Sequence, residues 1–128
     1  ARLESSNKQF DTQILLSQRT YELVQEHVLA RPIGRIRVVG KEAFETVYEL
    51  LADNENADDE QRELATMTDQ AVDAFIAGDF KRAIERFEAL ADKFGQSKLT
   101  DLYLEHCRRY LDDGKPDDFR GELVLTQK

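Results

Sequence analysis

The sequence predicts an α+β fold in which a β-α-β-β segment precedes three antiparallel helices. Short apolar or alternating stretches, typical of strands, occur before residue 53, whereas apolar residues recur at helical spacing after residue 60. Residues 53–60 between them are acidic and almost devoid of apolar side chains, as in a solvated linker. We therefore expect a segment 1–52, a linker 53–60 and a helical segment 61–128. A length of 128 residues suits one domain, or two small modules sharing a core.

The first segment begins with residues 1–8, which we expect to finish a helix. Residues 12–16 are apolar, short and bounded by turn-forming residues, so they predict a buried strand. Ser17 follows them and is a good N-cap, because its hydroxyl can accept from the free amides of a first helical turn. A helix over residues 18–27 is therefore expected.

An antiparallel hairpin should complete this segment. Pro32 and Gly34 interrupt the chain before residues 35–38, which alternate polar and apolar side chains with the period of a half-buried strand. A turn at residues 40–42 then leads to the β-branched and aromatic stretch 46–50. The alternation puts Arg35 and Arg37 on the solvated face of the hairpin.

The helical segment has the 3.6-residue period throughout. Gly78 ends its first helix, a second runs over residues 80–94 to Gly95, and a third follows the cap Ser97 to about Gly114. Because the loops between consecutive helices have only two or three residues, we expect these helices to pack antiparallel. The tail at residues 123–126 predicts a short strand or an extended segment docked on the helices.

Charge is unevenly distributed along the chain. The net charge is −8, yet residues 1–52 hold seven basic and seven acidic residues, so the helical segment and linker carry all of it. An acidic chain repels phosphate, which argues against binding to nucleic acid or to an anionic membrane surface. The single cysteine, Cys107, excludes an internal disulfide and a CxxC-type zinc site. No apolar run is long enough for a membrane span.

The spacing in the helical segment resembles one tetratricopeptide repeat. In such repeats small residues let two helices approach closely while aromatic residues fill the groove between them. The residues that match are Ala71, Gly78, Phe80, Ala83, Phe87 and Leu90.

The first segment resembles the carboxyl end of class III adenylate and guanylate cyclase catalytic domains. The matching stretches, in family order, are residues 1–4 (ARLE), 7–8 (NK), 12–17 (TQILLS), 35–41 (RIRVVGK) and 47–51 (VYELL). The helical segment, with residues 119–122 (FRGE) and 125–126 (LT), is similar to the carboxyl-terminal extension of bacterial cyclases. The resemblance implies that the β-α-β-β segment is the remnant of a ferredoxin-like cyclase layer.

The resemblance also implies a reaction and two site residues. Such enzymes convert ATP or GTP to a cyclic nucleotide and pyrophosphate in signal transduction, with two Mg or Mn ions and an active site formed across a dimer. Arg2 matches the arginine that stabilises the charged transition state, and Lys41 matches a lysine that reaches the nucleotide phosphates. The metal-binding aspartates would precede Ala1, so we assign no metal ligand and no cofactor to this chain and expect it to be inactive alone. An Asn four residues before Arg2 would complete the motif.

The same resemblance sets expectations for the parent protein. We interpret the chain as the cytoplasmic part of a longer protein whose remaining part could carry a membrane anchor, forming a homodimer and making no direct membrane or nucleic-acid contact.

Simpler interpretations accompany these assignments. Without the family, Arg2 is a solvated terminal arginine and Lys41 a surface turn lysine. His106 and Cys107 are adjacent and point about 100° apart on a helix, so they predict packing rather than a metal site. Asp58 to Glu60 lacks the alternating ligands of a calcium loop. The alternative function is a non-catalytic interaction module, in which the helices bind a peptide or mediate dimerisation.

Overall fold

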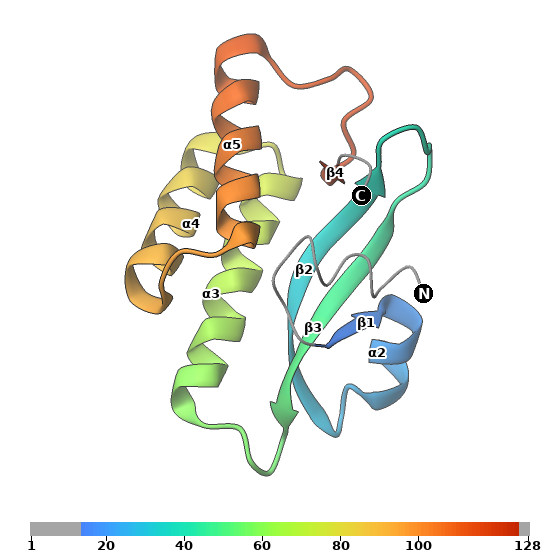
Figure 1. Cartoon of the computed structure of the whole chain (residues 1–128), viewed down its shortest axis with the longest axis vertical. Coiled ribbons are helices and arrows are strands. Elements are labelled where there is room, and N and C mark those ends of the chain that lie inside the picture. Colours follow the sequence, from blue (N-terminus) through green and yellow to red (C-terminus); the bar gives the residue numbers. More distant parts are fainter. Residues whose placement is uncertain (1–13, 126–128) are drawn as a thin grey trace.

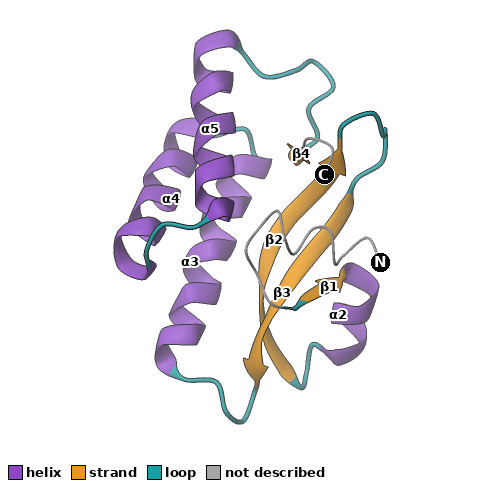
Figure 2. Cartoon of the chain, in the orientation of Figure 1, coloured by secondary structure: helices purple, strands orange, loops and turns teal. Residues whose placement is uncertain are grey.

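A computed structural model describes residues 14–125 and has an α+β architecture (Figure 1). Its four-stranded sheet has the order β1-β3-β2-β4. Helices α3, α4 and α5 stand on one side of the sheet and the short α2 lies beside β1 (Figure 2). The elements, in chain order, are β1 (Leu15–Ser17), α2 (Gln18–Val24), β2 (Val28–Val38), β3 (Glu45–Asp53), α3 (Asp59–Ile76), α4 (Phe80–Phe94), α5 (Lys98–Asp113) and β4 (Glu122–Leu125).

The first strand and helix follow the expected order with shifted bounds. β1 starts at Leu15, and the expected residues 12 and 13 lie outside the described residues. The Ser17 hydroxyl accepts from the Thr20 amide at 3.2 Å, so the predicted N-cap is confirmed. α2 ends at Val24, three residues earlier than expected.

Strand β2 corrects the expectation that Pro32 and Gly34 interrupt the chain. It runs unbroken for 11 residues through both and pairs antiparallel with β3, which confirms the hairpin. The register shifts between Leu29 and Ala30 and again between Pro32 and Gly34. Such bulges let a strand accept a proline, which has no N–H to donate, and a glycine with positive φ.

The expected linker 53–60 is short and partly helical. β3 extends to Asp53, and α3 already begins at Asp59. Asp58 accepts from the Gln61 amide at 2.7 Å while the Gln61 side chain accepts from the Asp58 amide at 3.0 Å, forming a capping box. The acidic residues therefore serve the helix start, where carboxylates are stabilised by the helix dipole.

The three predicted helices are confirmed; Ser97 caps α5 as expected, and Asp79 caps α4. The tail forms β4, parallel to β2, with Leu123 and Leu125 buried beneath the helices. The tail is thus a strand of the same sheet.

One hydrophobic core joins the two expected segments. Its members include Leu15, Ile33 and Val47 from the sheet together with fully buried Phe75 and Phe87 from the helices. Residues 1–52 and 61–128 therefore share a core within the described part of the chain.

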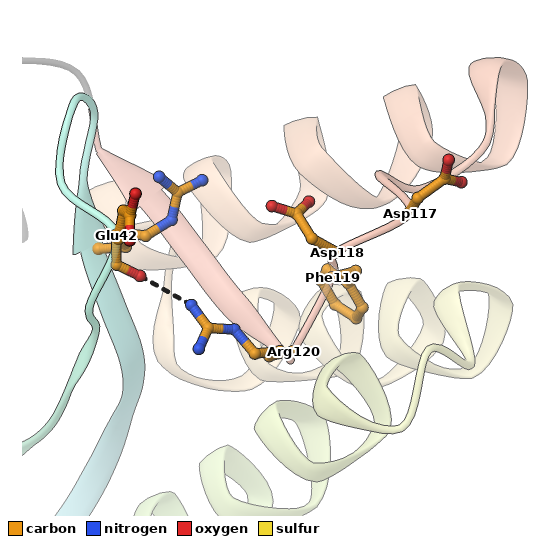
Figure 3. Close-up of a pocket in the computed structure, with 6 residues that line it drawn as sticks. Glu42, Asp117, Asp118, Phe119 and Arg120 are labelled. Atoms are coloured by element: carbon orange, nitrogen blue, oxygen red, sulfur yellow. Dashed lines mark hydrogen bonds between the residues drawn. The ribbon is translucent and has the colours of Figure 1, made fainter.

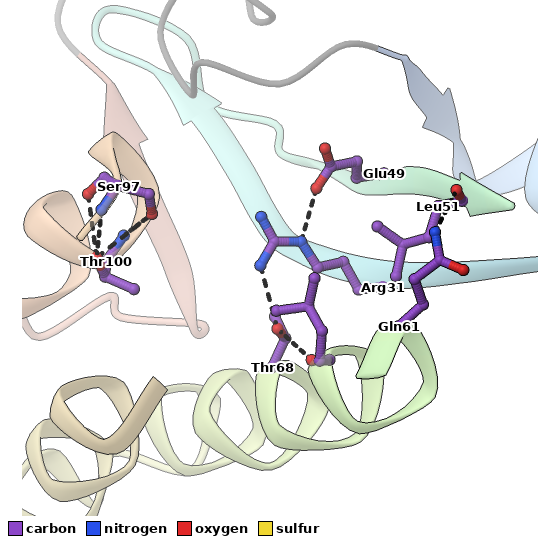
Figure 4. A network of polar contacts seen from close by, with 8 residues as sticks. Arg31, Glu49, Leu51, Gln61, Thr68, Ser97 and Thr100 are labelled. Atoms are coloured by element: carbon purple, nitrogen blue, oxygen red, sulfur yellow. Dashed lines mark hydrogen bonds and ion pairs between the residues drawn. The ribbon is translucent and has the colours of Figure 1, made fainter. Parts of the chain in front are cut away.

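An ion pair is buried where the sheet meets α3 (Figure 4). Arg31 on β2 is 9% exposed; its Nε lies 2.6 Å from Glu49 Oε1 on β3, and its Nη1 donates to the Thr68 hydroxyl at 3.3 Å. A buried guanidinium needs such partners because desolvation is costly. This network fixes α3 against the hairpin.

Candidate functional site

Lys41 lies in the turn that joins β2 to β3, residues 39–44, here called the Lys41 turn. Two arginines hold its backbone: Arg37 Nη1 donates to the Lys41 carbonyl at 2.7 Å, and Arg120 Nη2 donates to the Glu42 carbonyl at 2.7 Å (Figure 3). The Lys41 amide donates to the Val38 carbonyl at 3.0 Å. The Lys41 side chain is exposed, and none of residues 14–125 pairs with its ammonium group. Among the described residues, Lys41 therefore presents an unpaired ammonium group on a backbone that two arginines hold.

Contacts with the Phe44 ring add to the hydrogen bonds that hold the Lys41 turn. The guanidinium carbons of Arg35 and Arg120 lie 5.3 and 5.2 Å from the centroid of the Phe44 ring, within cation–π range. Arg35 Nη1 also donates to the Arg120 carbonyl at 2.6 Å. Residues from β2, the turn and the chain before β4 are thus joined at one place.

Glu122 balances part of the positive charge of the arginine cluster, by which we mean Arg35, Arg37 and Arg120. The glutamate is only 4% exposed, and its Oε2 lies 3.5 Å from Arg37 Nε. Its Oε1 accepts from the Arg120 amide at 2.7 Å. Arg37 Nε is buried without a hydrogen bond, so this pair is held by charge rather than by hydrogen-bond geometry.

A pocket of about 520 Å³ opens beside the arginine cluster (Figure 3). Charges of both signs line it, so it suits a polar occupant. Its lining residues are Arg37, Glu42, Asp117, Asp118, Phe119 and Arg120. Lys41 is not among these residues, although two of them, Arg37 and Glu42, are its hydrogen-bond partner and its neighbour in the chain.

The site residues inferred from the sequence have different outcomes. Arg2 lies outside the described residues, so its role stays a prediction. Lys41 is where a turn was expected, and its contact with the phosphates of a nucleotide also stays a prediction. Arg35 and Arg37, expected on a solvated face, are instead half-buried and engaged with the turn and tail.

Sequence reasoning missed Arg120 and Phe44 as parts of this site. Arg120 is 78 residues from the carbonyl that it contacts, and no periodicity connects residues so distant in the chain. The sequence offers only an indirect indication of Arg120, because residues 119–122 belong to the stretch that resembles the family but carry no assigned role.

His106 and Cys107 pack in the core, as the sequence indicated. They are 5% and 0% exposed, and burial raises the pKa of the Cys107 thiol to about 12. Burial lowers the pKa of His106, whose Nδ1 lies 2.9 Å from the Leu102 carbonyl oxygen. Among residues 14–125, no group of three or more His, Cys, Asp or Glu side chains could hold a metal ion.

A second hollow, of about 660 Å³, lies between α4 and α5. Acidic side chains dominate its lining, which consists of Glu88, Ala91, Asp92, Gln96, Asp101, Leu104, Glu105 and Arg108. Arg108 Nη2 is paired with Glu88 at 3.0 Å. This hollow is a groove between α4 and α5, and it gives the helical segment a negatively charged surface.

Comparisons with known proteins do not place the chain in a family. A scan against protein-family models, a search of curated proteins and a search of solved structures each gave no match. Within residues 14–125, no helix combines the length and apolar character that a membrane crossing requires.

Proposed function

We propose that this chain is the carboxyl-terminal part of a class III nucleotide cyclase, which converts ATP or GTP to a cyclic nucleotide and pyrophosphate. The observation that carries the proposal is the Lys41 turn: an exposed ammonium group on a backbone held by Arg37 and Arg120. The family resemblance assigns a phosphate-binding lysine to this position. An exposed ammonium group favours the triphosphate by charge, and the held backbone limits the region that this flexible side chain can reach.

Two residues of this chain have separate roles in the proposed reaction. Lys41 binds a phosphate oxygen, while Arg2 stabilises the transition state. The two Mg or Mn ions that the family resemblance implies would be held by aspartates upstream of Ala1 and would supply charge neutralisation of the triphosphate.

The proposal extends to the parent protein. We expect it to work as a homodimer in the cytoplasm, where its nucleotide substrate is found, with this chain making no direct membrane contact. The net charge of −8 supports the absence of nucleic acid among its partners.

A first experiment tests the chain as it stands. Incubation of the 128-residue protein with ATP and Mn²⁺ is expected to yield no cyclic AMP above a heat-denatured control, because the metal-binding segments are missing. Cyclic AMP formed by the folded protein above that control would contradict this assignment.

A second experiment restores the upstream segments. The extended protein should cyclise ATP or GTP, and Lys41→Ala should lower kcat/KM on the order of 100-fold, as loss of one charged donor to a transition state typically does. Lys81→Ala, which removes an equally exposed lysine on α4, is the matched control and should change little. An extended, dimeric and well-folded protein without cyclase activity would overturn the proposal.

The groove between α4 and α5 favours a second candidate function, a non-catalytic interaction module. Its acidic lining suits a basic peptide, and the helical spacing resembles a tetratricopeptide repeat. Light scattering of the 128-residue chain, with and without a lysine-rich helical peptide, separates the two candidates. A chain that stays monomeric and does not bind the peptide would contradict the interaction module.

A further inference from the structure

We infer that Arg120 is a positioning residue that couples the helical segment to the Lys41 turn. Its role in phosphate binding rests on the function proposed above, whereas its hold on the turn does not.

The coupling starts in the core between the helices. Phe119 packs edge-on against three aromatic rings, with ring centroids 5.5 Å from Phe75, 5.6 Å from Phe80 and 5.7 Å from Tyr110. These rings belong to α3, α4 and α5. The position of Phe119 is therefore set by all three helices together.

The residue after Arg120 is anchored as well. Gly121 has φ +84°, and a Cβ there would meet Ile76 of α3 at 2.9 Å from its side chain. The chain thus passes α3 too closely for any side chain at this position. Phe119 and Gly121 together fix the backbone on either side of Arg120 against the helices.

The Arg120 side chain reaches the hairpin from this anchored backbone. Its Nη2 donates to the Glu42 carbonyl at 2.7 Å (Figure 3). Its guanidinium carbon lies 5.2 Å from the Phe44 centroid. Arg37 also holds the turn but belongs to β2 itself. Within residues 14–125, Arg120 is the side chain that brings a hydrogen bond to the turn from beyond the helices.

The hold of Arg120 reaches Lys41 through the chain, because the Glu42 carbonyl that it binds belongs to the next residue. Arg37 holds the Lys41 carbonyl from β2, whereas Arg120 adds a link to the helices, since Phe119 and Gly121 place its backbone against α3, α4 and α5. A partner or ligand that shifts these helices would therefore move the lysine without touching it.

Amide hydrogen exchange of the 128-residue chain tests the coupling directly. Arg120→Ala should speed exchange of the Lys41 amide, which donates to the Val38 carbonyl at 3.0 Å, about 5- to 10-fold, because the turn loses one of the hydrogen bonds that hold it. Exchange in α3 should stay unchanged, which shows that the fold persists. Arg120→Lys keeps a donor and a charge and should restore part of the protection.

Arg62→Ala is the matched control. Arg62 is also an exposed arginine that donates to a backbone carbonyl, Asn54 at 3.1 Å, but it lies at the opposite end of the hairpin. It should leave exchange of the Lys41 amide unchanged. Equal effects of Arg62→Ala and Arg120→Ala on this amide, or no effect of Arg120→Ala, would overturn the inference.

A titration with inorganic tripolyphosphate at low ionic strength separates this inference from the proposed function. Arg120→Ala should weaken tripolyphosphate binding several-fold and Lys41→Ala should weaken it more. If Lys41→Ala leaves binding unchanged, the proposed role of Lys41 fails, while faster exchange in Arg120→Ala would still support the positional coupling.

Discussion

At the scale of single residues, Gly34 decides how closely the helices approach the sheet. The Tyr103 hydroxyl of α5 donates to the Ile33 carbonyl at 2.7 Å, and the Tyr103 ring is fully buried. A Cβ at Gly34 would collide with that hydroxyl, and φ is +132° there. Burial without an acceptor would be costly for the phenol, so this contact needs the glycine.

Gly34→Ala is therefore expected to lower the free energy of unfolding by about 3 kcal/mol or more, from backbone strain and overpacking combined. Urea denaturation followed by circular dichroism measures this. Gly40→Ala is the control, because φ is +91° there but a Cβ meets nothing within 4 Å; it should cost about 1–2 kcal/mol of strain alone. Equal losses in both variants would contradict the close approach.

At the scale of elements, β4 joins the end of the chain to both the sheet and α5. Leu123 and Leu125 enter the core, being 0% and 3% exposed, while Glu122 turns toward the arginine cluster. His106 of α5 contacts the backbone of Val124 in addition to the Leu102 carbonyl. The alternation of β4 therefore links the hydrophobic core and the candidate site.

The burial of His106 predicts a pH dependence of stability. Burial and Arg109 lower the folded-state pKa of His106 below its usual 6.5, although Glu105 and the two backbone contacts oppose them. The unfolded state then binds the proton more readily, so the stabilising contribution is complete above pH 6.5 and falls as the pH drops toward the lowered pKa. The slope from this one group is at most about 1.4 kcal/mol per pH unit.

Urea denaturation between pH 7.5 and 5.5 measures this fall. His106→Gln should flatten the fall, and His27→Gln, at an exposed position, should leave it as it is. A fall of the same size in His106→Gln as in the unaltered chain would show that other groups cause it.

At the scale of the whole molecule, one core predicts one unfolding transition. Sheet residues such as Leu15 and Val47 belong to the same cluster as Leu90 and Leu99 of the helices. Methyl signals of these four residues, followed by NMR through a urea titration, should therefore disappear with the same midpoint. Separate midpoints for sheet and helices would contradict the shared core.

The sequence by itself determined the local structure of this protein. The period of its apolar residues located three helices and the hairpin, and Ser17, Asp79 and Ser97 marked helix starts because caps act within one turn. Local signals misled at Pro32 and Gly34, where pairing with β3 on one side outweighed the tendency of these residues to end a strand.

Tertiary structure alone decided how these elements combine. The parallel docking of β4 on β2, the shared core and the hold of Arg120 on the Lys41 turn join residues 70 or more positions apart. The amphipathic pattern of an element indicates which of its faces is buried, but not which other element covers that face. A motif in the sequence pointed to Lys41. The contacts of Arg120 with the Lys41 turn form only because the packing of α3, α4 and α5 brings the tail back to the hairpin.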